Sequence, residues 1–101
     1  MNKKLFDKII VQILNYYDIS KYELYEQSKM PDVVNARYLL FYICELKGIS
    51  ISRLQKLLEE DGFDMTYATI LRGVKAIKTR INENDEYKKV LETILKNIDA
   101  Q

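Results

Sequence analysis

The sequence contains no histidine, and Cys44 is its only cysteine. A single thiol cannot form an intramolecular disulfide, and without histidine the usual zinc sites and the Cys-His and Ser-His-Asp catalytic arrangements are missing as well. Cys44 lies in the apolar run YLLFYICEL, where we expect a buried structural thiol. The sequence therefore predicts no catalytic residue, no metal site and no cofactor, and we do not expect an enzyme.

Long apolar runs and phosphate loops are also absent. No stretch of about 18 apolar residues occurs, so no membrane span is expected. The start, MNKKLFDKIIVQIL, is interrupted by Asp7 and Lys8 and lacks a small-residue cleavage site, so no secretory signal is expected. Because G-x-x-x-x-G-K-[ST] does not occur, we expect no bound nucleotide. These absences predict a cytoplasmic protein.

Proline occurs once and glycine three times, whereas 48% of the residues are apolar and 31% are charged. This composition is typical of a soluble helical domain, and a length of 101 residues suits one hydrophobic core. We therefore expect residues 1–101 to form a single domain. The net charge of +1 gives no overall argument for a nucleic-acid binder, so the argument depends on where the charges lie.

Apolar residues recur at spacings of three and four, which predicts an all-α fold of six helices and no strand. The expected helices cover about residues 3–17, 20–27, 33–47, 50–60, 66–81 and 87–98. The run from residue 33 to residue 47 is apolar on nearly every side, which is typical of a central helix. Between these helices we expect a loop over residues 28–32 before and after Pro31, and a polar break over residues 82–85.

Local signals mark several helix ends. Ser20 and Glu23 have the spacing of a capping box, and either Ser50 or Ser52 is suited to cap the fourth helix. Gly48 and Gly62 stand where glycine favours the end of a helix.

Residues 50–81 have the outline of a helix-turn-helix, because two helical segments are joined there by a short turn that contains Gly62. In that motif the start of the second helix meets base edges in the major groove. The predicted base-side residues are small or hydrogen-bonding ones: Thr66, Tyr67, Ala68 and Thr69. Basic residues farther along the helix, Arg72, Lys75 and Lys78, are predicted to contact phosphate.

The chain from about Ile10 to Ile98 resembles the C-terminal DNA-binding domain of the bacterial replication initiator DnaA. Four segments carry the resemblance: ILNYYDISKYELYEQSK, ARYLLFYICEL, ISISRLQKLL and TYATILRGVKAIKTRI. They are similar, in order and spacing, to the family's first two helices, its A-R-Q-x-x-x-Y-L-x-x-E-L segment, its S-L-x-x-I-G stretch and its D-H-T-T-V-L-H-A-x-x-K-I segment. The resemblance implies a six-helix bundle of the Trp-repressor-like type and a role in replication or its regulation.

The residues that read DNA in that family differ in this chain. The signature R-D-H-T-T-V corresponds to residues 65–70, where only Thr69 keeps its type. The family's arginine-rich loop before the third helix corresponds to residues 28–32, where Lys29 is the only basic residue. Arg37 matches the family's arginine at the start of the third helix. We therefore expect a stand-alone double-stranded DNA-binding domain, and not a complete initiator, whose preference has diverged from the DnaA box.

A second interpretation remains open. The turn LEEDGFD carries Glu59, Glu60, Asp61 and Asp64, which would repel phosphate. Acidic residues at a helix start and basic residues near its end also stabilise a helix without any ligand. The alternative function is a protein-interaction module, an adapter or regulator of replication proteins that kept the fold and lost DNA readout. The surface charge distinguishes the two functions. DNA binding predicts a continuous positive stripe on the surface that joins Lys29, Arg37, Arg72, Lys75 and Lys78.

Overall fold

The computed structural model describes residues 2–26 and 29–100, in which six α-helices and no strand occur. The helices are α1 (Lys3–Tyr17), α2 (Lys21–Tyr25), α3 (Pro31–Leu46), α4 (Ile51–Glu60), α5 (Tyr67–Glu83) and α6 (Asp85–Asp99). The predicted all-α fold is thereby confirmed. The second helix expected to reach Gln27 is too long, because α2 ends at Tyr25 and Glu26 is extended with a ψ of 146°. Gln27 itself and the expected loop residue Ser28 lie outside the described residues.

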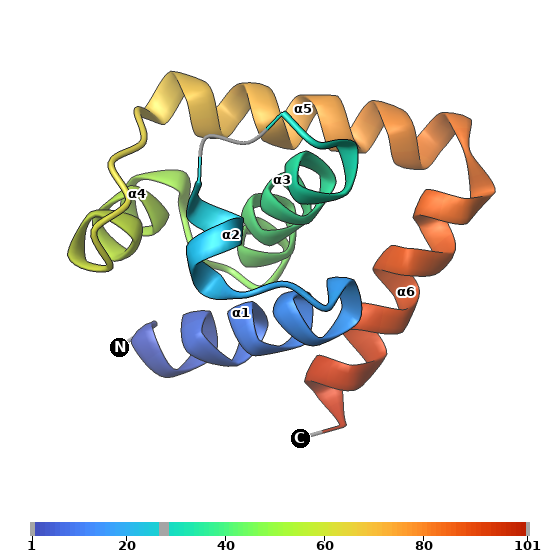
Figure 1. Cartoon of the computed structure of the whole chain (residues 1–101), viewed down its shortest axis with the longest axis horizontal. Helices are drawn as coiled ribbons and strands as arrows, with labels where there is room; N and C mark the ends of the chain where they lie inside the picture. The colour runs from blue at the N-terminus through green and yellow to red at the C-terminus, as the bar shows by residue number, and fades with distance from the viewer. Residues whose placement is uncertain (1, 27–28, 101) are drawn as a thin grey trace.

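The helix α3 lies in the middle of the molecule and packs against α1, α2, α4 and α5. Figure 1 shows α1 and α5 on opposite sides of α3, with α6 descending along one side to pack against both. Several side chains of α3 are fully buried, among them Leu39, Leu40, Phe41 and Ile43. Because its neighbours surround it, α3 needs apolar residues on nearly every face, as its sequence has.

Cys44 belongs to this buried set, with 0% of its surface exposed. Burial raises the pKa of the Cys44 thiol far above its ordinary value. The burial expected of Cys44 is therefore confirmed, and its raised pKa favours the protonated thiol.

Local capping signals account for most helix ends. The Ser20 hydroxyl accepts a hydrogen bond from the Glu23 amide at 3.1 Å, and Glu23 Oε1 accepts one from the Ser20 amide at 3.0 Å. The cap of α4 is Ser50 and not Ser52, because the Ser50 hydroxyl accepts from the Arg53 amide at 3.1 Å. Gly48 follows α3 with a φ of 90°, a conformation that glycine adopts without strain.

The loop predicted over residues 28–32 is wrong at its end, because α3 begins at Pro31. Proline suits the first position of a helix, since the amide hydrogen that it lacks has no partner there in any case. The restriction that proline places on its neighbour falls on Met30, which is extended with a ψ of 129°. Pro31 therefore starts the central helix and does not belong to the preceding loop.

The predicted polar break over residues 82–85 is also too long. Helix α5 continues to Glu83, and only Asn84 separates it from α6. The Asn84 amide donates to the Arg80 carbonyl at 3.0 Å, while Asn84 Oδ1 accepts from the Glu86 amide at 2.9 Å. One extended asparagine thus ends one helix and caps the next.

Candidate nucleic-acid interface

The turn between α4 and α5 is held against α2. Gly62 has a φ of 86°, and Phe63 after it is buried. The Phe63 ring stacks on the ring of Tyr25, with centroids 4.6 Å apart and planes inclined by 16°. The Tyr25 hydroxyl in turn donates to Asp61 Oδ2 at 2.7 Å. The path of the chain into α5 is therefore set by contacts with α2, and not by the turn alone.

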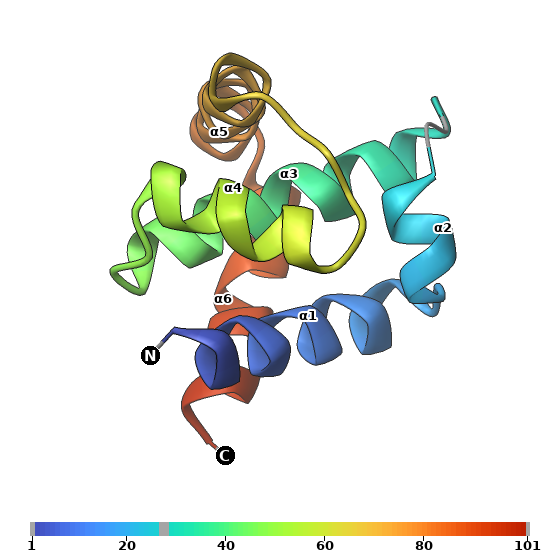
Figure 2. The ribbon, with the colours of Figure 1, turned by 90° about the vertical axis from the view of Figure 1, so that its left-hand side faces the viewer.

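Helix α5 lies along one side of the molecule with its outer face uncovered. In Figure 2, α5 is viewed nearly along its axis at the top, while α4 runs crosswise beneath it. The buried residues Ile70, Gly73, Val74 and Ile77 face the core. On the other side, the residues Ala68, Arg72, Lys75 and Thr79 recur at intervals of three and four and are all exposed.

The start of α5 holds the predicted base-side residues. Thr66 caps the helix, because its hydroxyl accepts from the Thr69 amide at 3.1 Å. The Thr66 and Thr69 hydroxyls are 2.8 Å apart, and Arg72 donates to Thr69 Oγ1 at 3.3 Å. Ala68 is exposed, and so is Tyr67, with 48% of its surface accessible. The four residues 66–69 thus lie together at one end of the uncovered face.

The predicted phosphate-side residues of α5 differ in their surroundings. Arg72 and Lys75 are exposed, and neither forms a salt bridge with a residue that the structure describes. Lys78 is exposed as well, but its Nζ lies 3.4 Å from Glu45 Oε1 and 5.5 Å from the centre of the Tyr42 ring. Two cations on this face are therefore free to meet an anion, and the third is already partly neutralised.

Arg37, which the sequence assigns to phosphate, lies under α2. Its guanidinium donates to the carbonyl oxygens of Leu24, at 3.1 Å, and of Glu26, and it lies 5.9 Å from the centre of the Phe63 ring. Burial lowers the pKa of Arg37 from its ordinary value. The structure thus gives Arg37 the task of satisfying carbonyls at the end of α2. Lys29, the other predicted contact outside α5, is exposed.

The acidic turn is only partly neutralised. Asp61 Oδ2 lies 2.6 Å from Lys21 Nζ, and Asp61 Oδ1 lies 3.7 Å from Lys3 Nζ. Burial alone would raise the pKa of Asp61, but the hydrogen bonds from Lys21 and Tyr25 and the nearby lysine charges outweigh it and lower that pKa. Glu59, Glu60 and Asp64 stay exposed. Of the four acids, Asp61 is therefore a structural group directed toward α1 and α2.

Sequence reasoning did not find a polar cluster at the other end of α5. Arg80 donates to Asn35 Oδ1, and Asn35 Nδ2 donates to the Tyr87 hydroxyl at 3.2 Å. The Arg80 guanidinium also lies 5.5 Å from the centre of the Tyr38 ring. Asn35 is the one polar residue among the buried side chains of α3, and an amide flanked by apolar residues in the sequence was the available signal. Arg80 thus joins α5 to α3 and is not part of the outer basic face.

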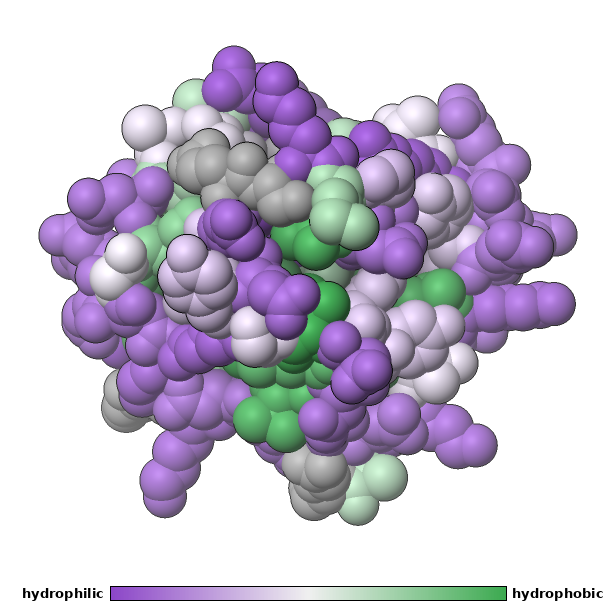
Figure 3. Space-filling view, viewed as in Figure 1, coloured by the Kyte–Doolittle hydropathy of each residue, from purple (hydrophilic) through white to green (hydrophobic). Residues whose placement is uncertain are grey.

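Figure 3 shows that hydrophilic residues dominate the upper edge of the molecule, where α5 lies, and that hydrophobic residues form a narrow band near the middle of this view.

Comparison of the chain with protein-family models, with curated proteins and with solved structures finds no match.

None of the helices in the part of the chain that the structure describes has the length and apolar character needed to cross a membrane. Within residues 2–26 and 29–100, no group of three or more histidine, cysteine, aspartate or glutamate side chains is placed to hold a metal ion.

Proposed function

We propose that this protein is a cytoplasmic double-stranded DNA-binding module in which α4, the turn at Gly62 and α5 form a helix-turn-helix of the DnaA C-terminal type. The observation that carries the proposal is the outer face of α5, where Arg72 and Lys75 are exposed and form no salt bridge with a described residue. Residues 66–69 occupy the helix start, where the motif places base contacts. The resemblance to the initiator domain supports the same assignment and a role in replication or its regulation.

In this proposal, Tyr67, Ala68 and Thr69 meet base edges, while Arg72 and Lys75 contact backbone phosphates. Thr66 acts mainly as the helix cap, because its hydroxyl already accepts from the Thr69 amide. Lys29 and Lys78 add weaker phosphate contacts. Arg37 is left out of the interface, because carbonyl oxygens of α2 occupy its guanidinium.

The test is binding of labelled random-sequence duplex, measured by fluorescence anisotropy at low and at moderate salt. Lys75→Ala should weaken binding to all duplexes by a similar factor and flatten the log-log salt slope by roughly one, because a phosphate contact carries no base information. Lys4→Ala is the matched control, since Lys4 is an exposed lysine on α1, across the molecule from α5. Equal binding by the two variants would contradict the proposed face.

Base contacts have a separate test. Thr69→Ala should change the ranking of sites recovered from a random duplex pool, because Thr69 is proposed to meet base edges. Thr79→Ala, an exposed threonine farther along the same helix, should leave the ranking unchanged. Both side chains make only exposed hydrogen bonds, so stability should change by no more than about 0.5 kcal/mol. An unchanged ranking with Thr69→Ala would remove this residue from the readout.

A second function has its own observation in favour. Glu59 and Glu60 at the end of α4 and Asp64 in the following turn are exposed, and Tyr67, the first residue of α5, is 48% exposed. Exposed acids and an exposed aromatic ring suit a protein partner better than a phosphate backbone. If the parent chain shows no salt-dependent duplex binding, and Tyr67→Ala removes a partner captured by the parent, the protein-interaction function replaces DNA binding.

A further inference from the structure

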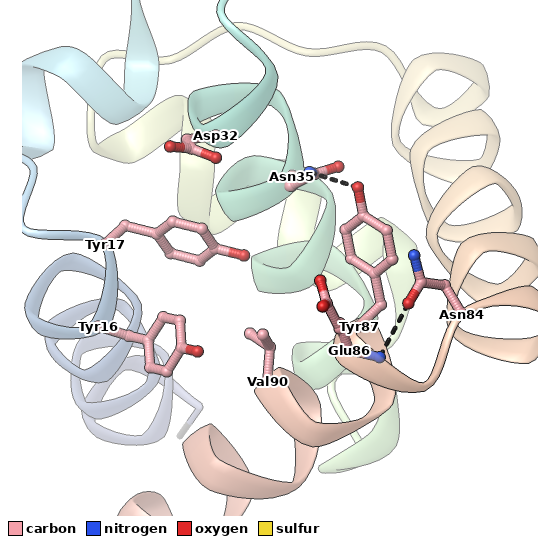
Figure 4. Close-up of a pocket in the computed structure, with 8 residues that line it drawn as sticks. All are labelled: Tyr16, Tyr17, Asp32, Asn35, Asn84, Glu86, Tyr87 and Val90. Carbon is pink, nitrogen blue, oxygen red and sulfur yellow. Dashed lines mark hydrogen bonds between the residues drawn. The ribbon is translucent and has the colours of Figure 1, made fainter.

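A pocket of about 420 Å³ lies where the end of α1, the start of α3 and the start of α6 meet. Figure 4 shows the residues around it: Tyr16 and Tyr17 from α1, Asp32 and Asn35 from α3, and Glu86 and Tyr87 from α6. No base-side or phosphate-side residue of the proposed interface lines it. The pocket is therefore separate from the DNA face and needs an explanation of its own.

Three tyrosine rings give this pocket its character. The Tyr16 and Tyr17 rings meet edge to face, with centroids 5.2 Å apart and planes inclined by 67°. In Figure 4 the hydroxyl ends of both point toward α6. Tyr16 is 43% exposed, so the core does not require its ring. The Tyr17 hydroxyl forms no hydrogen bond with a described residue, whereas that of Tyr87 accepts from Asn35.

The charge of the pocket has one sign. Asp32 and Glu86 line it, no lysine or arginine does so among the described residues, and neither carboxylate forms a salt bridge with any of them. Each carboxylate stands in the first turn of a helix, whose end carries about +0.5 of an elementary charge. The two carboxylates exceed those two helix ends by roughly one negative charge. The pocket is therefore suited to a cation.

Basic side chains lie on the other side of the pocket wall. A neighbouring pocket of about 380 Å³ shares Asn35 and Tyr87 with the first one and is lined by Lys29 and Arg80. Arg80 reaches Asn35 Oδ1 from that side, while Asn35 Nδ2 is bonded to Tyr87. The hydrogen-bonded wall thus keeps the guanidinium out of the tyrosine pocket and leaves its carboxylates without an internal partner.

We propose that the pocket formed by Tyr16, Tyr17, Asp32, Glu86 and Tyr87 binds an alkylammonium ion. Aromatic rings attract such ions through the negative charge of their faces, and this attraction is stronger where water is partly excluded. Carboxylates beside the rings add direct charge attraction. The volume admits a substituted ammonium group together with a short carbon chain. Two sources supply this chemistry: a free amine, and the lysine side chain of a protein.

The test is a titration of the folded chain, followed by NMR of the tyrosine rings and by calorimetry at constant ionic strength. Choline is the probe, and dimethylbutanol, in which carbon replaces the quaternary nitrogen, is its neutral isostere. Choline should bind about tenfold or more tightly than the isostere, the ratio that corresponds to 1.4 kcal/mol. Nα-acetyl-lysine methylamide, whose side-chain ammonium is free, represents a protein lysine. Tighter binding of this compound than of choline assigns a protein as the source, and tighter binding of choline assigns a free amine.

Two variants connect this binding to the pocket. Glu86→Gln should weaken choline binding about tenfold while keeping the shape of the side chain, and Tyr16→Ala should weaken it several-fold by removing one ring. Both residues are exposed, so both variants are expected to fold. Glu92→Gln, at an exposed position on the same helix outside the pocket, should bind choline like the parent. Equal affinity for choline and its isostere, or parent-like binding by Glu86→Gln and Tyr16→Ala, would overturn the proposal.

Discussion

At Gly73 the absence of a side chain allows α5 to approach α3. A Cβ atom built at this position would lie 2.8 Å from Tyr38 Cδ1 and 3.1 Å from Phe41 Cδ2. Phe41 is completely buried, and the Arg80 guanidinium lies against the Tyr38 ring, so neither ring has room to move easily. The outer basic face is therefore positioned by one small residue on the opposite side of the helix.

We predict that Gly73→Ala destabilises the protein. Alanine in a helix interior is favoured by about 1 kcal/mol over glycine, but overpacking a core contact costs about 1–3 kcal/mol. The free energy of unfolding, measured by urea denaturation, should fall by up to about 2 kcal/mol. Ala76→Gly in the same helix measures the propensity contribution by itself. A gain of stability in Gly73→Ala would show that the contact with α3 relaxes without cost.

Asp61 is expected to make the free energy of unfolding depend on pH in the acid range. Its pKa is lowered in the folded protein, so the stabilisation is present above its unfolded pKa of about 3.9 and is lost as the pH falls through the folded value. Asp61→Asn should therefore be less stable than the parent at neutral pH, and the difference should shrink by about pH 3. Urea midpoints at the two pH values measure this effect. Asp64→Asn, in the same turn and without a salt bridge to a described residue, should follow the parent.

Among the helices, α4 offers a direct test of capping, because two serines compete in the sequence and the structure selects one. The Ser50 hydroxyl accepts a hydrogen bond from the Arg53 amide, whereas Ser52 is the second residue of α4 and its side chain is exposed. Ser50→Ala should lower the free energy of unfolding by about 1 kcal/mol, while Ser52→Ala should leave it unchanged or raise it slightly. Equal effects of the two substitutions would mean that the cap contributes little to the stability of α4.

Helix α2 shows how a short element depends on its neighbours. It has five residues, too few for a helix to be stable alone, and its capping box satisfies only its first turn. Its other supports are the Arg37 guanidinium at its carbonyl end and the stacking of Tyr25 on Phe63. Because the same Phe63 belongs to the turn before α5, α2 is part of what orients the proposed recognition helix.

For the whole molecule, the proposed DNA contacts are few. Lys29, Arg72, Lys75 and Lys78 are the basic side chains proposed to contact phosphate, and the net charge is only +1. We expect a shallow log-log salt slope, on the order of −3 to −5, because the slope follows the number of neutralised phosphates. Duplex binding measured over a series of salt concentrations tests this number. A binding constant independent of salt would point away from DNA.

The preference of the protein for one DNA sequence over another also depends on the whole proposed interface. In the family that this chain resembles, a conserved segment reads the DnaA box. The corresponding residues 65–70 of this chain differ from that segment, and only Thr69 is of the same type. Each good bidentate base contact is worth about 1–3 kcal/mol of discrimination, so their loss should leave little preference for that box over a scrambled duplex. Competition between the two duplexes measures the preference. A nanomolar, box-selective complex would contradict the expected divergence.

The sequence by itself determined the helices, because helix formation and capping depend on residues three or four positions apart. The periodicity of apolar residues, the Ser20–Glu23 pair and Gly48 all gave their elements correctly. The boundary errors at Pro31 and at Asn84 have the same kind of local cause. In each case one residue has the role of starting a helix where the pattern suggested a loop.

Only the tertiary structure decided which charged side chains are available to a ligand. Arg37 and Asp61 are used inside the molecule by carbonyls, lysines and a tyrosine that lie far from them in the sequence. The tyrosine pocket likewise gathers residues from three separate segments. Hydrogen bonds and ion pairs between distant segments form only when packing brings their partners together, and no spacing along the chain encodes that meeting.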